Sequence, residues 1–97
     1  MWPHATLPAT HFRATALAVP TLLISGDADP VTPPRWAEGA RRYLPNARHV
    51  VFPTGGHVPF GTPCAAALAS AFIVAGDTRA PDVSCAATLT RPPFKLL

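Results

Sequence analysis

Two short strand-forming runs constrain the fold of this 97-residue chain more than any other feature. Residues 19–25 form a continuous apolar run that ends at Gly26-Asp27, and residues 48–52 form a second run that ends at Pro53. Because the first run does not alternate with polar residues, it predicts a strand covered on both faces. A helix-length segment separates the runs, so we expect a right-handed crossover and parallel strands, which is an α/β architecture.

Each expected strand is followed by a segment that opens like a helix. Thr32 and Thr62 each stand before a proline, which places a capping hydroxyl next to a residue that needs no N–H. We expect helices over residues 33–44 and 63–75, with Gly76 ending the second. The first helix should group three apolar residues on one face, Trp36, Ala40 and Leu44. On its solvent face Glu38 should pair with Arg42.

The predicted unit is too small to be a complete sheet. Residues 1–18 and 77–97 are irregular and interrupted by prolines, which leaves a β-α-β-α unit over residues 19–76. Two parallel strands alone have bare edges and faces that need cover. We therefore expect residues 1–97 to be a single partial domain, one portion of a larger α/β sheet.

Composition excludes several classes of function. The net charge is +3, but the only adjacent basic pair is Arg41-Arg42, so we expect no nucleic-acid surface. The longest apolar run, residues 65–76, is too short for a membrane span, and no signal peptide is visible at the start. The two cysteines lack zinc-site spacing and the histidines do not cluster with them, so we expect no metal and no cofactor.

Asp29 and His57 are the candidate reactive residues. Each follows one of the parallel strands, so both side chains are expected at the carboxyl edge of the sheet, where strands lie about 4.8 Å apart. A buried carboxylate that accepts the Nδ1–H of a histidine sets its tautomer and leaves the other ring nitrogen free to take a proton. Gly55-Gly56 is expected to let the loop before His57 turn sharply.

Other interpretations of these residues remain open from the sequence alone. An aspartate before proline is a common turn former, and a histidine after two glycines is a common loop residue. Asp27 is a rival carboxylate, although its place nearer the strand end suits a turn better. His49 lies inside the second strand, while His4 and His11 lie in the irregular entry, and none of the three has a partner that the sequence identifies.

The segment Ile-Ser-Gly-Asp-Ala-Asp-Pro-Val-Thr-Pro-Pro at residues 24–34 resembles the acid segment of α/β-hydrolase-fold serine hydrolases. More narrowly, it resembles the C-terminal region of the tripeptidyl-aminopeptidase-like (TAP-like) family. Further similarity to this family covers nearly the whole chain, at Trp2-Pro3, residues 44–48, Gly55-Gly56-His57, Cys64, Cys85 and residues 91–94.

The resemblance implies catalytic roles for two residues and a gap for a third. Asp29 would be the acid and His57 the base of a catalytic triad whose serine lies on a Gly-x-Ser-x-Gly elbow. None of the serines of this sequence, Ser25, Ser70 and Ser84, has glycines two residues away on both sides. The nucleophile and the oxyanion hole are therefore expected outside this chain, which alone should be inactive.

The cysteines have two interpretations. Judged by residue type alone, Cys64 and Cys85 are compatible with two buried free thiols. The family resemblance instead implies a disulfide between them. That disulfide would suit a secreted or cell-envelope enzyme.

The function implied is the C-terminal part of a serine peptidase-like hydrolase, an aminopeptidase acting on peptides. Two alternatives stay open: an esterase-type hydrolase acting on a small ester or amide, and a non-catalytic fragment or truncated gene product.

Overall fold

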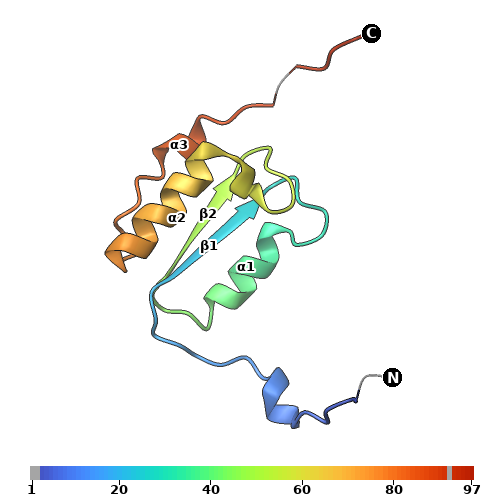
Figure 1. The fold of residues 1–97 in the computed structure, drawn as a ribbon, viewed down its shortest axis with the longest axis vertical. Helices are drawn as coiled ribbons and strands as arrows, with labels where there is room; N and C mark the ends of the chain where they lie inside the picture. Colours follow the sequence, from blue (N-terminus) through green and yellow to red (C-terminus); the bar gives the residue numbers. More distant parts are fainter. Residues whose placement is uncertain (1–2, 92) are drawn as a thin grey trace.

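The computed structural model describes residues 3–91 and 93–97, so Trp2 and Pro92 of the family-like segments lie outside the described residues. Within these described residues, two strands, three α-helices and two short 3-10 helices follow one another (Figure 1). In chain order they are η1 (Ala9–Phe12), β1 (Thr21–Gly26), α1 (Pro34–Arg41), β2 (Ala47–Phe52), η2 (Pro59–Gly61), α2 (Pro63–Ala75) and α3 (Ser84–Ala87).

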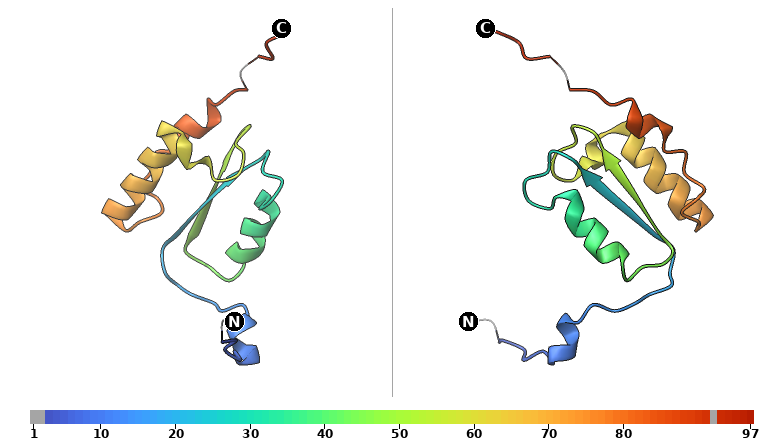
Figure 2. Two further views of the ribbon diagram at one scale, coloured as in Figure 1. Left: turned by 45° about the vertical axis from the view of Figure 1, so that its right-hand side comes forward. Right: turned by 180° about the vertical axis from the view of Figure 1, so that it is seen from behind.

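Strands β1 and β2 form a parallel pair, as the sequence predicts. Thr21 lies opposite Ala47 at one end of the register, and Gly26 lies opposite Phe52 at the other. Helix α1 covers one face of the pair, whereas α2 and α3 cover the other face (Figures 1 and 2). The α/β class is confirmed, and both strands finish at the same edge, which places the loops after them side by side.

The apolar core lies on the face covered by α2 and α3. Val50 and Phe52 of β2 point to this face and pack with Ala65 and Leu68 of α2 and Ala86 of α3. Alternate residues of the strands point to the opposite face, under α1. Among the eight described residues of α1 none is buried, and Trp36 is 59% exposed. The helices α2 and α3 therefore contribute buried side chains to the core, whereas α1 contributes none.

Helix α2 has the predicted bounds. The Thr62 hydroxyl accepts a hydrogen bond from the Ala65 N–H at 3.2 Å and caps the first turn. Gly76 adopts a left-handed conformation with φ of 64° and donates its N–H to the Phe72 carbonyl at 2.8 Å. Both ends of α2 were predictable because each depends on a residue next to the helix.

Helix α1 differs from its prediction at both ends. It begins at Pro34 and ends at Arg41, and its N-cap is Pro33 rather than Thr32. The Thr32 hydroxyl donates to a carboxylate of the preceding loop instead of capping. Glu38 pairs with Arg41 at 3.0 Å, so the predicted pairing with Arg42 is wrong.

The tail beyond α2 is more ordered than expected. The four-residue α3 lies within it, and a disulfide joins Cys64 in α2 to Cys85 in α3, with Cα atoms 5.9 Å apart. Arg48 of β2 donates to the carbonyls of Thr78 and Pro81 at 3.0 and 3.1 Å. The tail is thus tied both to α2 and to the sheet.

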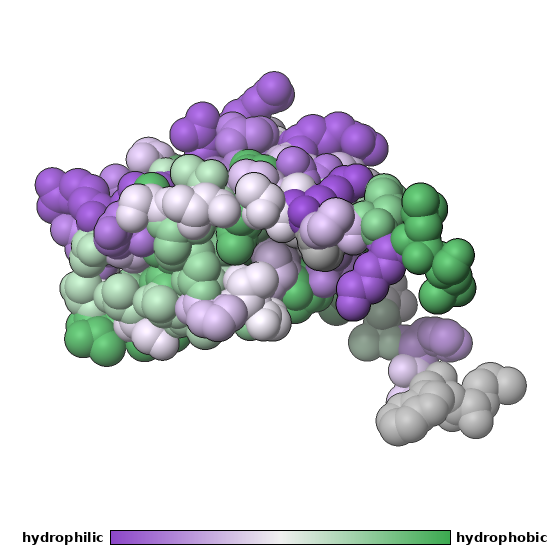
Figure 3. All heavy atoms as spheres, turned by 90° about the horizontal axis from the view of Figure 1, so that it is seen from above, coloured by the Kyte–Doolittle hydropathy of each residue, from purple (hydrophilic) through white to green (hydrophobic). Residues whose placement is uncertain are grey.

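Much apolar surface is exposed at the periphery. Seen from above, hydrophobic patches border hydrophilic ones at the edges of the molecule (Figure 3). The large exposed apolar side chains include Val58, Phe60, Ile73 and Val74. Within residues 3–91 and 93–97, no helix has the length and apolar character that crossing a membrane requires.

Candidate catalytic site

The two candidate residues meet at the carboxyl edge of the sheet. His57 Nδ1 lies 2.9 Å from Asp29 Oδ2, which is hydrogen-bonding distance. The Asp29 side chain is 3% exposed, whereas that of His57 is 48% exposed. The predicted contact between the carboxylate and the imidazole is confirmed, with the carboxylate enclosed and the imidazole open to solvent.

The loop between β1 and α1 is wrapped around the Asp29 carboxylate. The N–H groups of Val31 and Thr32 donate to Oδ1 at 2.8 and 3.0 Å, and the Thr32 hydroxyl donates to Oδ2 at 2.6 Å. Burial alone would raise the pKa of Asp29, but the hydrogen bonds from Thr32, His57 and Val31 outweigh it and hold that pKa well below its usual range. Asp29 is therefore ionised at neutral pH.

An ionised Asp29 determines which nitrogen of His57 carries the proton. A carboxylate only accepts hydrogen bonds, so the neutral ring donates Nδ1–H to Asp29 and keeps Nε2 unprotonated. Thr32 Oγ1 lies 3.2 Å from the same Nδ1 and is a second, weaker acceptor. His57 can thus take a proton at Nε2, and the resulting imidazolium would face a carboxylate.

The two loops are joined backbone to backbone. The Ala28 N–H donates to the Gly55 carbonyl at 2.9 Å, and the Asp27 carboxylate accepts from the Thr54 N–H at 2.6 Å. Asp27 therefore serves the turn before His57 and is not the partner of the ring. Gly26 lies so close to this turn that a Cβ added there would stand 2.2 Å from the Gly55 oxygen. Close approach of the two loops requires glycine at this position.

The turn before His57 is made differently from the sequence prediction. Among the described residues, Gly76 is the one glycine with a positive φ, so Gly55 and Gly56 do not supply a left-handed turn. Thr54, before the ring, and Val58, directly after it, adopt the left-handed conformation instead, with φ of 62° and 55°. Such a conformation costs a β-branched residue about 1–3 kcal/mol, and strain of this size gathers at functional sites.

His49, for which the sequence indicated no partner, has two. Its Nδ1 lies 2.6 Å from Glu38 Oε1, and its Nε2 lies 2.9 Å from Ser25 Oγ. The hydrogen bond from His49, helped by the nearby Arg41, lowers the pKa of Glu38. The one available signal was the strand register, because Ser25 and His49 share a face of the sheet only when β1 and β2 pair as they do.

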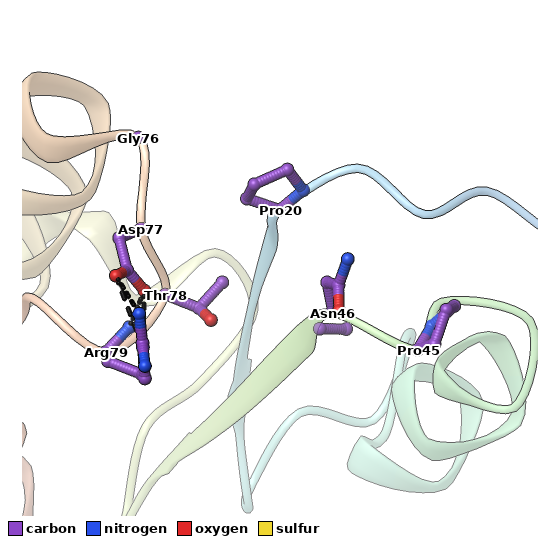
Figure 4. A pocket seen from close by; sticks show the side chains of 8 residues that line it. Pro20, Pro45, Asn46, Gly76, Asp77, Thr78 and Arg79 are labelled. Carbon is purple, nitrogen blue, oxygen red and sulfur yellow. Dashed lines mark hydrogen bonds and ion pairs between the residues drawn. The ribbon is translucent and has the colours of Figure 1, made fainter.

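Two cavities border the Asp29–His57 pair. One of about 310 Å³ is lined by His57, Val58 and Gly61, among others, and one of about 280 Å³ by Asp29, Trp36 and Phe60. A larger cavity, about 550 Å³, lies at the opposite end of the strands beside the Asp77–Arg79 ion pair (Figure 4). The Asp29–His57 contact and this larger cavity are thus at opposite ends of the sheet.

Among residues 3–91 and 93–97, no three side chains of His, Cys, Asp or Glu are grouped so that they could hold a metal ion.

Comparison with known proteins decides the family. The model of the family described as TAP-like protein matches residues 1–85. The chain belongs to the TAP-like family of α/β-hydrolases. A 41-residue segment of this TAP-like chain is 49% identical to the pimeloyl-[acyl-carrier protein] methyl ester esterase of Nitrosomonas europaea. That match covers 42% of the chain and 16% of the esterase, and no solved structure matches the TAP-like chain significantly.

Proposed function

We propose that this TAP-like chain is the C-terminal part of a serine hydrolase and supplies the acid, Asp29, and the base, His57, of its catalytic triad. The observation that carries the proposal is the 2.9 Å contact between a buried carboxylate and a half-exposed imidazole. Membership of the TAP-like family and the parallel strands that present both residues at one edge support it. None of the serines of this chain, Ser25, Ser70 and Ser84, lies on a Gly-x-Ser-x-Gly elbow, so we assign the nucleophile to another part of the enzyme.

The residues of this chain would act on a proton. His57 Nε2 takes the proton of the serine hydroxyl as that oxygen attacks a substrate carbonyl. Asp29 stabilises the imidazolium through Nδ1–H. The imidazolium then protonates the leaving amine or alkoxide, and the same ring activates the water that releases the acyl group from the serine. These steps need no cofactor.

Two substrate classes follow from different observations. The family favours peptides, cleaved by an aminopeptidase similar to the tripeptidyl aminopeptidases. The match to a methyl ester esterase favours a small ester instead. Asp29 and His57 serve both, because the ring moves the same protons whether the leaving group is an amine or an alkoxide. The Cys64–Cys85 disulfide suits an exported enzyme in either case.

The proposal is tested by turnover. Residues 1–97 are compared with a form extended by the in-frame sequence encoded upstream of Met1, on aminopeptidase and on ester substrates. We expect turnover by the extended form alone, reduced roughly 10⁴-fold or more by His57→Ala or Asp29→Ala. His11→Ala is the matched control, because His11 is an exposed histidine of the entry segment.

Three results would contradict the proposal. Turnover by residues 1–97 alone would mean that a serine of this chain is the nucleophile. Turnover that survives His57→Ala would mean that His57 is not the general base. A stop codon directly upstream, or an extended form without activity, would favour the non-catalytic fragment.

A further inference from the structure

A buried histidine outside the Asp29–His57 contact joins the two elements that flank the acid loop, which we define as residues 27–33 between β1 and α1. His49 Nε2 is 2.9 Å from Ser25 Oγ, four residues before Asp29, and Nδ1 is 2.6 Å from Glu38 Oε1, nine residues after it. The His49 side chain is 3% exposed. It stands on β2 and reaches β1 with one ring nitrogen and α1 with the other.

The hydrogens of this array form a complete chain. The Glu38 carboxylate accepts, so neutral His49 donates Nδ1–H to it and leaves Nε2 as an acceptor. The Ser25 hydroxyl then donates to Nε2. Each polar atom of the buried ring is satisfied in this arrangement, and the hydrogen bond to an ionised partner is of the stronger kind.

The array acts where apolar packing is weak. None of the eight described residues of α1 is buried, so the helix is not held by a core of its own. The loop that ends at Pro34, the first residue of α1, carries the Val31 and Thr32 N–H groups that bind the Asp29 carboxylate. A shift of α1 would therefore move the groups that hold Asp29.

We propose that His49 is a positioning residue: it clamps β1 to α1 across the acid loop and thereby holds Asp29 within hydrogen-bonding distance of His57. This proposal rests on the proposed function in one respect, namely that the Asp29–His57 contact serves catalysis. The effect of His49 on the position of the acid loop does not depend on that function.

The array has the connectivity of a Ser-His-acid triad but not its surroundings. Ser25 is only 7% exposed and lies on the sheet face that α1 covers. Asp29 also lines the small cavity that Ser25 borders, and its charge would oppose an oxyanion there. The array is suited to holding the loop rather than to attacking a substrate.

Amide hydrogen exchange at Val31 and Thr32 tests the clamp, in residues 1–97 or in the extended protein. Glu38→Ala breaks the array from its solvent side, because that side chain is 48% exposed and its loss leaves the core intact. We expect roughly tenfold faster exchange at both amides, with the β1–β2 amides unchanged. Glu38→Gln, whose amide oxygen can still accept from Nδ1–H, should restore part of the protection.

Two further variants complete the design. Arg41→Ala removes only the exposed ion pair with Glu38 and should leave the exchange unchanged. Ser25→Ala breaks the other end of the array and should act in the same direction as Glu38→Ala. In a form with measurable turnover, Glu38→Ala should lower kcat with KM unchanged, and Glu38→Gln should recover part of it.

Unchanged exchange at Val31 and Thr32 in Glu38→Ala and Ser25→Ala overturns the clamp. Equal acceleration throughout β1 and β2 also overturns it, because the array would then stabilise the fold as a whole. Labelling of Ser25 by a fluorophosphonate would assign the array to catalysis instead. None of these exchange results depends on hydrolysis, so the clamp and the proposed function can fail separately.

Discussion

Gly26→Ala is expected to move the acid loop away from the loop that carries His57, residues 53–58 between β2 and η2. The added Cβ would stand 2.2 Å from the Gly55 oxygen and 2.5 Å from the Gly56 oxygen, both backbone atoms that no side-chain rotation can move. Ordinary contact begins near 3.4 Å, so the loop before His57 must retreat by about 1 Å. A retreat of that size stretches the 2.9 Å contact between Asp29 and His57 beyond hydrogen-bonding distance.

Two measurements follow the displacement. The Ala28 N–H, which donates to the Gly55 carbonyl at 2.9 Å, should lose its protection from hydrogen exchange, and the overpacked loop should cost about 1–3 kcal/mol of stability. In a form with turnover, kcat/KM should fall roughly 10²-fold, as expected for a misplacement of about 1 Å. Gly56→Ala is the matched control, because a Cβ at Gly56 meets nothing within 4 Å. Unchanged protection of Ala28 in Gly26→Ala, or equal losses in the control, would mean that Gly26 does not set the spacing of the two loops.

Three further predictions concern stability and charge. Free-thiol titration of the oxidised, denatured chain should find no thiol, and two titratable thiols would contradict the disulfide. Replacing both Cys64 and Cys85 by alanine should lower the free energy of unfolding by about 3 kcal/mol, the chain-entropy value for a separation of 21 residues. Because the pKa of Asp29 is lowered by folding from its ordinary value of 3.8, its stabilising contribution is complete above that pH and is lost as the pH falls below it. Acid unfolding of Asp29→Asn should therefore lack that part of the pH dependence, and an unchanged acid profile would contradict the lowered pKa. Thr32→Val removes the hydroxyl that donates to Oδ2 and should raise the pKa of Asp29 in a carboxyl titration followed by NMR, whereas an unmoved pKa would mean that the hydroxyl plays no part.

The parts of the fold that depend on neighbouring residues could be predicted from the sequence. The strands follow from their apolar runs, and α2 follows from Thr62 at its start and Gly76 at its end. The meeting of Asp29 and His57 needed only one further inference, that parallel strands end at the same edge. These features are predictable because no distant group competes for the residues that specify them.

Features that depend on competition or on register could not be predicted in this way. A capping hydroxyl accepts from the first turn of its helix, but the Thr32 side chain is directed to the Asp29 carboxylate, to which it donates, and α1 begins after Pro33 with no side-chain cap. The role of His49 requires the register of two strands and the rotation of a helix, since its partners Ser25 and Glu38 come from different elements. The left-handed Val58 contradicts the preference of its own residue type, so only the surrounding loop can impose it.

The tautomer of neutral His57 decides whether this ring can act as the proposed base, because the base must keep Nε2 free. Nitrogen-15 NMR of the neutral ring should show the proton on Nδ1, donated to Asp29. In Asp29→Asn the proton should move to Nε2: the N–H groups of Val31 and Thr32 hold the amide oxygen at the Oδ1 position, so the amide NH₂ faces the ring and donates to Nδ1. A proton on Nε2 in the unaltered chain, or the same tautomer in both proteins, would contradict the assignment of Asp29 and His57 as acid and base.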